Sequence, residues 1–176
     1  MKKLLITTDS FLDLKDGIAR YLNEIIPRIK NKFKITVLAP QLNNVYDKER
    51  YKGVKVKFLP AFKFRISGYK PSKPFNKLLK KEVESCDILW NQIMAPLGAS
   101  AILYASKLKK TIITTTHVIE WELIKNAIVR KLPHLVIGPH IKLLIRKLYN
   151  KCDLIIAPSK SVVETLKENN ITKKKK

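Results

Sequence analysis

The 176-residue chain is long enough to bury the core of one domain, and its 45% hydrophobic content is ordinary for a globular protein. Thirty-six Lys and Arg residues outweigh 14 Asp and Glu residues, which gives a formal net charge of +22. No apolar run approaches the roughly 20 residues of a membrane-spanning helix, and the run after Met1 is too short for a signal peptide. We therefore expect a cytoplasmic protein.

Short apolar runs bounded by turns alternate with longer helical patterns along the chain. The short runs predict strands at Leu4–Thr8, Lys34–Ala39, Val54–Leu59, Ile88–Trp90, Thr111–Thr115 and Leu154–Ala157. The longer patterns predict helices at Gly17 to about Asn31, Pro74–Glu84, Pro96 to about Leu108, and about 119–131, 139–150 and 160–169. The predicted fold class is α/β: a single Rossmann-like, doubly wound parallel sheet over residues 1–170, with 171–176 as a basic tail and candidate truncation point.

The cysteines and two of the three histidines indicate no metal site. Cys86 and Cys152 each precede an Asp and an apolar run, and we expect both to be free, buried thiols. His134 and His140 flank the Gly138-Pro139 pair, which predicts that both lie in loops. No metal or cofactor is expected.

Ligands of doubly wound sheets bind outside the carboxyl ends of the strands. That rule selects four loops, which we expect to converge on one rim: Asp9–Gly17, Asn91–Pro96, Thr116–Trp121 and Pro158–Ser161. The candidate cleft residues on these loops are Asp16, Asn91, Glu120 and Ser159. Ser159 also has the sequence context of a helix N-cap.

Two rim residues have chemistry suited to a site. Gly17 opens a helix, where free N–H groups favour phosphate oxygens, although an Asp N-cap followed by a permissive Gly explains the same residues. His117 follows the fifth strand, and an imidazole there can donate to a sugar hydroxyl or a carbonyl. A structural role for His117 stays open on local evidence.

Four spaced segments resemble the N-terminal domain of the retaining GT-B glycosyltransferases of family four. They are the Asp9…Phe11…Gly17 loop, Cys86–Asn91, Thr114–His117 and Asp153–Lys160. The resemblance implies two Rossmann-like domains facing a cleft, with the acceptor on the N-terminal domain and the nucleotide-sugar on the other. It places Gly17 beside the donor diphosphate and makes His117 the catalytic residue that hydrogen-bonds the transferred sugar. Asp13 and Asp16 depart from the Pro and the first Gly that family members often carry in this loop.

The resemblance also implies a hexosyltransferase that needs a donor-binding domain. In the family, the sequence would run on past Lys176 into that domain. We therefore expect no transfer by this chain alone, and a separate donor-domain chain is one way to complete the cleft.

The positive charge is concentrated in blocks without acids. Residues 50–81 hold eleven Lys and Arg, and residues 125–151 hold seven beside an apolar helical face with Ile141, Leu144, Ile145 and Leu148. This pattern favours contact with an anionic inner membrane surface through Arg65, Lys70, Lys73, Lys77, Lys142 and Arg146. Lipid-modifying members of the resembled family use their N-terminal domain in this way, so the resemblance implies a lipid or glycan acceptor. A lysine-rich solvated surface remains open. A basic nucleic-acid-binding domain is the alternative function, disfavoured because no RRM, KH, zinc-finger or helix-turn-helix signature is present.

Overall fold

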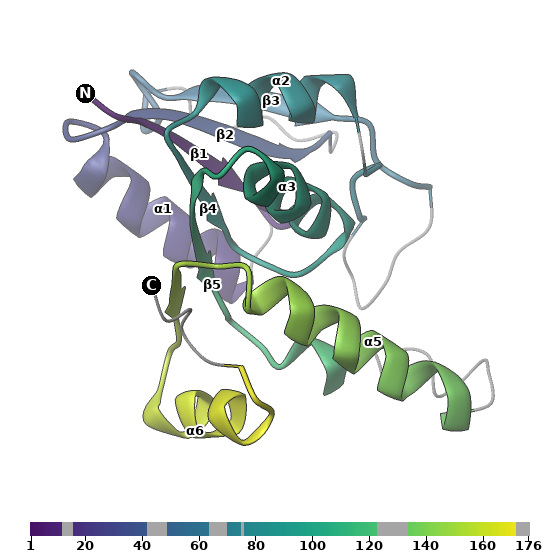
Figure 1. The fold of residues 1–176 in the computed structure, drawn as a ribbon. Helices are drawn as coiled ribbons and strands as arrows, with labels where there is room; N and C mark the ends of the chain where they lie inside the picture. Colours follow the sequence, from purple (N-terminus) through teal and green to yellow (C-terminus); the bar gives the residue numbers. More distant parts are fainter. Residues whose placement is uncertain (12–15, 42–48, 64–69, 75, 123–133, 172–176) are drawn as a thin grey trace.

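One parallel sheet organises the chain, whose computed structural model describes residues 1–11, 16–41, 49–63, 70–74, 76–122 and 134–171 (Figure 1). The strands are β1 (Lys3–Thr7), β2 (Lys34–Pro40), β3 (Lys55–Leu59), β4 (Ile88–Asn91), β5 (Thr111–Thr115) and β6 (Leu154–Ile156). Their order is β3-β2-β1-β4-β5-β6, and every neighbouring pair is parallel. The predicted Rossmann-like sheet is confirmed.

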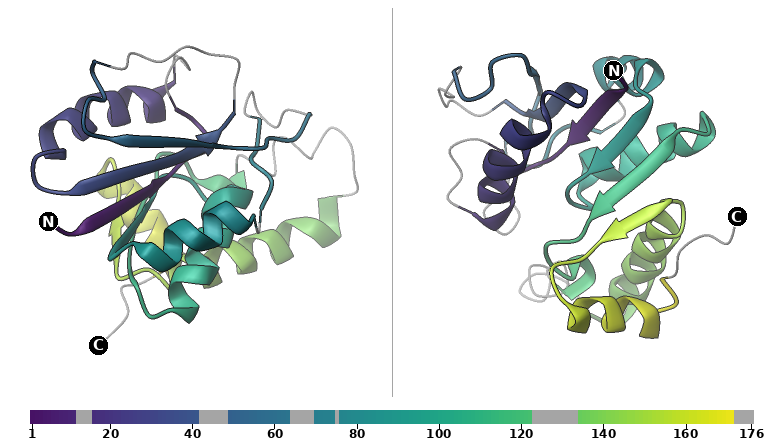
Figure 2. Two further views of the ribbon diagram at one scale, coloured as in Figure 1. Left: turned by 90° about the horizontal axis from the view of Figure 1, so that it is seen from above. Right: turned by 90° about the vertical axis from the view of Figure 1, so that its left-hand side faces the viewer.

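Helices cover both faces of the sheet. They are α1 (Gly17–Ile29), α2 (Lys77–Ser85), α3 (Pro96–Lys107), α5 (His134–Tyr149) and α6 (Lys160–Glu168). Figures 1 and 2 show α1 on one face, with α2, α3 and α5 side by side on the other. The chain turns helical again at Glu120, but most of the predicted 119–131 helix lies outside the described residues.

Alternating side chains of the strands build a separate core on each face, as strand geometry requires. Leu5, Leu38 and Leu89 pack with α2 and α3. Leu4 and Ile6 pack on the other face with the apolar stripe of α1. The sheet is therefore buried on both faces at its centre, as expected of a parallel sheet.

The prediction that His134 and His140 lie in loops is wrong. Helix α5 begins at His134 and continues through Pro139, so His134 and His140 are helical and not loop residues. Proline's restricted φ is compatible with a helix, and near the start of α5 its missing N–H removes one intrahelical hydrogen bond. The remaining turns of α5 proceed to Tyr149.

The two cysteines are free and buried, as predicted. Burial raises the pKa of the Cys86 thiol to about 11, which keeps it protonated near neutral pH. Within the described part of the chain, no helix has the length and apolar character needed to cross a membrane.

Candidate functional site at the carboxyl ends of the strands

Four adjacent strands bring the predicted loops to one edge of the sheet. Strands β1, β4, β5 and β6 are consecutive neighbours in the sheet and run parallel, so the segments that follow them emerge along the same rim. Figure 1 shows this edge beyond the tips of the strand arrows. Residues far apart in sequence can meet there.

The loop after β1 is clamped where it enters α1. The Ser10 hydroxyl donates to Asp16 Oδ2, while Asp16 Oδ1 accepts from the Ala19 N–H at 2.9 Å. Asp16 is thus the N-cap of α1, as the local reading of the sequence allowed. Gly17 is exposed, and an added Cβ there would meet nothing within 4 Å. Among the described glycines only Gly53 has a positive φ, so neither packing nor conformation requires a glycine at position 17.

Asn91 lies inside the sheet and joins three strands. Its Oδ1 accepts from the Thr7 hydroxyl at 3.0 Å, and its Nδ2 contacts Thr114 Oγ1 at 3.2 Å and the Ile93 carbonyl at 3.1 Å. The side chain is fully buried. A Cβ on Gly98 would lie 2.2 Å from both Asn91 Oδ1 and the Ile93 carbonyl, so α3 approaches this network as closely as a glycine permits. Asn91 therefore supports the rim from within and does not project into a cleft.

His117 is half-buried and meets side chains from α1 and the β4 loop. Its Nε2 lies 3.1 Å from Gln92 Oε1, and its ring packs edge-on against Tyr21 with centroids 5.3 Å apart. Burial lowers the pKa of His117, and the nearby Asp16 carboxylate opposes that shift. The structure therefore brings Asp16, at the start of α1, near His117, at the end of β5.

Tyr21 and Gln92 are site residues that the sequence reasoning missed. Tyr21 follows Gly17 by four residues, so it lies on the same face of α1, and that spacing could have identified it. The Tyr21 ring also packs edge-on against the Trp90 ring, with centroids 6.1 Å apart. Gln92 is fully buried, and its Nε2 has no hydrogen-bond partner among the described residues.

Glu120 is a buried carboxyl group beneath the rim. The Tyr149 hydroxyl lies 2.8 Å from each carboxylate oxygen, and the Met94 N–H lies 3.4 Å from Oε1. Burial raises the pKa of Glu120 to about 7, and the hydrogen bond from Tyr149 opposes this rise. Glu120 thus attaches α5 to the rim and, with 2% exposure, does not line its surface.

Asp9 is a second buried carboxyl group, also missed as a site residue. Its Oδ1 accepts from the Ser72 N–H at 2.7 Å, which ties the segment around Ser72 to the end of β1. Burial raises the pKa of Asp9 to about 6, and the hydrogen bond from the Ser72 N–H opposes this rise. Asp9 Oδ2 and Ser72 Oγ have no hydrogen-bond partner within the described residues.

Comparison with protein families matches residues 15–176 to Glycosyltransferase Family 4. The chain belongs to this family. The match confirms the resemblance drawn from the four sequence segments, and it covers Gly17, Asn91, His117, Glu120 and Ser159.

Two solved structures show a limited similarity to the chain at low identity. One is the molybdenum cofactor carrier protein MCP from Chlamydomonas reinhardtii, with 14% identity, a TM-score of 0.44, and coverage of 98% of this chain and 100% of that one. Another, from E. coli, is described as a ribokinase II in its apo form, with 10% identity, a TM-score of 0.49, and coverage of 99% and 73%. No curated protein matches the sequence.

The remaining predicted residues of the family 4 domain are spread over its surface. Ser159 is exposed and caps α6 through the Val162 N–H at 3.3 Å, as predicted. Lys73, Lys77 and Lys142 are exposed, Lys70 and Arg146 are half-buried, and Arg65 lies outside the described residues. In the described ranges no cluster of His, Cys, Asp or Glu could hold a metal ion.

Proposed function

We propose that this family 4 domain binds the acceptor in a sugar transfer from a nucleotide-sugar, with Gly17 beside the donor diphosphate and His117 beside the transferred sugar. The observation that carries the proposal is the meeting of two distant segments at one rim. The start of α1 and the end of β5 are about 100 residues apart, yet Tyr21 packs on His117 and Asp16 influences its pKa. Family membership supplies the reaction class.

The environment of His117 suits a neutral hydrogen-bonding group. Because burial lowers its pKa, the ring is uncharged near neutral pH. With Gln92 Oε1 as the acceptor, the ring carries its proton on Nε2 and leaves Nδ1 as an acceptor for a sugar hydroxyl. Tyr21 limits rotation of the ring, so the hydrogen bond is directed before the substrate arrives.

The open space at Gly17 supports the second half of the proposal. The first N–H groups of a helix have no intrahelical partner and carry the positive end of its dipole. At α1 they lie beside an exposed residue without a side chain. A diphosphate oxygen could approach the backbone at Gly17 without a steric barrier, ahead of the Ala19 N–H that Asp16 caps.

The test compares His117→Ala with His140→Ala, which removes an exposed imidazole on α5. Transfer from radiolabelled nucleotide-sugars is measured with the purified protein alone and after its addition to membranes from its own source cells. In whichever setting supports transfer, we expect a loss of about 100-fold in His117→Ala relative to His140→Ala. Equal transfer by the two variants, or none in either setting, would contradict the proposal.

We further propose that the acceptor is carried by an anionic membrane. The structure buries Ile145 and Leu148 of the predicted apolar face in the core, because this side of α5 packs on the sheet. Leu143 and Leu144 of α5 are instead 39% and 55% exposed and stand beside the exposed Lys142 and Lys147. Exposed apolar side chains flanked by lysines match the composition of interfacial helices. Figure 1 shows α5 extending to the side of the molecule where the strands end, so such a membrane would lie near the rim.

Liposome flotation tests the membrane proposal. The double variant Leu143→Ser, Leu144→Ser should lose recovery with anionic vesicles, whereas Leu108→Ser, which alters a residue 44% exposed after α3, should retain it. Equal recovery from neutral and anionic vesicles would contradict the proposal. Salt-dependent binding to random oligonucleotides without affinity for vesicles would favour the nucleic-acid alternative.

A further inference from the structure

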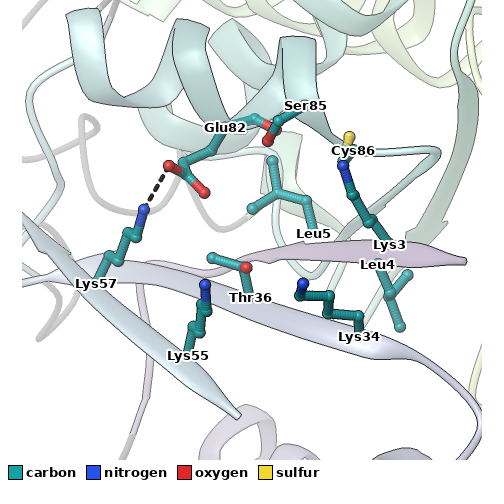
Figure 3. A pocket seen from close by; sticks show the side chains of 10 residues that line it. All are labelled: Lys3, Leu4, Leu5, Lys34, Thr36, Lys55, Lys57, Glu82, Ser85 and Cys86. Carbon is teal, nitrogen blue, oxygen red and sulfur yellow. Dashed lines mark hydrogen bonds and ion pairs between the residues drawn. The ribbon is translucent and has the colours of Figure 1, made fainter. Parts of the chain in front are cut away.

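A pocket lies at the amino ends of the strands, the end of the sheet opposite the rim. Figure 3 shows it between α2 and the amino-terminal halves of β1, β2 and β3. Its volume is about 220 Å³. Its polar lining consists of Lys3, Lys34, Thr36, Lys55, Lys57, Glu82 and Ser85. The Leu5 side chain and the Cys86 thiol form part of its apolar wall.

The strand register concentrates ammonium groups on one face. Lys3 and Lys34 are direct partners on β1 and β2, and Lys55 is the partner of Thr36, two residues further along β2. Neighbouring strands are about 4.8 Å apart, and alternate residues of a strand share a face. All three lysines therefore project toward α2, and Figure 3 shows Lys34 and Lys55 rising from the strands in that direction.

The cations of this pocket exceed its anions. Glu82 is buried and pairs with Lys57 at 2.5 Å. Asp87 lies nearby and accepts from the backbone N–H of Lys3 at 2.7 Å. Among the described residues, no ion pair joins Lys3, Lys34 or Lys55 to a carboxylate.

The carboxyl end of α2 does not supply the missing counter-charge. Its last carbonyls carry the negative end of the helix dipole, but Lys110 already neutralises them. The Lys110 ammonium donates to the Glu84 carbonyl at 2.9 Å and to the Cys86 carbonyl at 2.8 Å. The local excess of positive charge thus persists on this side of the pocket as well.

Protection of a sheet edge explains only part of the cluster. Lysines on an edge strand deter pairing with another chain, and β3 is an edge strand, which accounts for Lys55 and Lys57. Lys3 and Lys34 lie on the inner strands β1 and β2, whose edges are already paired. Placing like charges directly opposite each other destabilises a sheet. A bound anion would relieve that repulsion.

We propose that this pocket binds a phosphate-bearing anion, either a diphosphate or a phosphate monoester. Its volume corresponds to about seven liquid-water volumes at ~30 Å³ each, enough for a compact polyanion. The ammonium groups of Lys3, Lys34 and Lys55, which form no ion pair with the described residues, can each interact with a phosphate oxygen, and the Thr36 hydroxyl adds a neutral donor. The site is separate from the rim, because it lies at the amino ends of the strands.

Pyrophosphate titration at low ionic strength tests the proposal, with affinity measured by calorimetry and location by amide chemical shifts. The double variant Lys34→Gln, Lys55→Gln should bind about tenfold more weakly than the unaltered protein. The control Lys160→Gln, Lys167→Gln removes the same charge from α6, which follows the opposite edge strand. Its affinity should change by no more than about twofold, since long-range charge effects are screened.

A vesicle arm distinguishes a free phosphate from a lipid headgroup. Recovery with phosphatidic acid vesicles is compared for the same two double variants. Weaker binding by the Lys34→Gln, Lys55→Gln variant alone, to either pyrophosphate or vesicles, supports the site. The ligand that shows this difference identifies the source of the phosphate. Equal binding by both double variants in both arms, or shifts confined to the rim around Gly17 and His117, would overturn it.

Thermal unfolding gives a second measurement that requires no sugar transfer. Pyrophosphate should raise the midpoint of the unaltered protein more than that of the Lys34, Lys55 variant, because a ligand stabilises the state that binds it. Equal shifts in both proteins would count against the pocket. This result is independent of His117, so failure here and failure of the proposed transferase function are distinguishable.

Discussion

The two ends of the parallel sheet are built from different kinds of polar residue. At the carboxyl ends, Thr7, Asn91 and Thr114 are buried, uncharged and hydrogen-bonded across strands. At the amino ends, Lys3 and Lys34 are exposed and face each other without a counter-ion among the described residues. The rim that positions His117 therefore belongs to the folded core, whereas the lysine pocket, lined by Lys3, Lys34 and Lys55, is a surface feature. Substitutions should therefore cost stability at the first end and little at the second.

The largest expected effect comes from crowding the rim network with Gly98→Ala. The added methyl group would meet Asn91 Oδ1 and the Ile93 carbonyl at 2.2 Å, and a backbone carbonyl cannot easily move aside. We expect a loss of about 2–3 kcal/mol in the free energy of unfolding, measured in urea. The matched control Gly17→Ala places a methyl group in open space and should leave stability unchanged or raise it by about 0.5 kcal/mol. A similar loss in the free energy of unfolding in both variants would contradict the claim that Gly98 is tightly packed and Gly17 is not.

Glu120 makes the stability of the rim depend on pH. Its pKa of about 7 in the folded protein exceeds the ordinary 4.5, so the folded state binds more protons between these values. Stability should then fall as the pH rises from about 4.5 to above 7, and Asp9, with a pKa of about 6, acts in the same direction. Glu120→Gln should reduce this fall by about 1–3 kcal/mol.

Urea unfolding at pH 5 and pH 8 measures the contribution of Glu120. Glu122→Gln is the control, because it neutralises an exposed carboxylate two residues away. An undiminished pH dependence in Glu120→Gln would show that the buried carboxyl group is not its source.

A smaller effect should appear in the titration of His117. The Asp16 carboxylate raises its pKa against the dominant effect of burial, so Asp16→Asn should lower that pKa further. Asparagine remains a good N-cap, and α1 should stay intact. Ring NMR signals followed across pH measure the change, with Glu24→Gln, exposed on α1, as the control. A higher pKa in Asp16→Asn would contradict the arrangement of the two residues.

The smallest effect is expected at the amino ends. Lys34→Gln removes the repulsion from Lys3 and should raise the free energy of unfolding by about 0.2–0.5 kcal/mol at low salt. The gain should vanish at high salt, where exposed charges are screened. Lys160→Gln at the start of α6 serves as the control under both conditions. A loss of stability in Lys34→Gln would mean that the lysine makes a contact beyond those described.

Local sequence signals predicted most of the fold. The β-branched run Thr111–Thr115 coincides with β5, and the capping residues Asp16 and Ser159 begin α1 and α6 as their side chains suggest. These features depend on neighbours a few residues away, which a sequence displays directly. The Gly138-Pro139 pair misled because a helix can absorb one missing hydrogen bond near its start.

Whether each candidate site residue is buried or exposed could not be predicted from local sequence signals. Asn91 and Glu120 occur on the expected loops, but burial and partners from other elements decide their roles. Glu120 is paired with Tyr149, 29 residues later, and Asn91 with Thr7, 84 residues earlier. The lysine pocket is equally nonlocal, because only the pairing of β1 with β2 places Lys3 opposite Lys34.

The two tryptophans lie in different surroundings and can serve as intrinsic fluorescent probes of two parts of the molecule. Trp90 is 7% exposed, donates its indole N–H to Thr115 Oγ1 at 2.9 Å, and lies against the Tyr21 ring that also contacts His117. Trp121 lies instead beneath the Lys142 ammonium, 5.8 Å from its ring centroid. Indole emission responds to nearby polarity and charge, so occupancy of the rim should alter the Trp90 signal, and contact at α5 the Trp121 signal. Trp121→Phe would leave Trp90 as the remaining tryptophan, so binding at the rim could be followed by its fluorescence without any label.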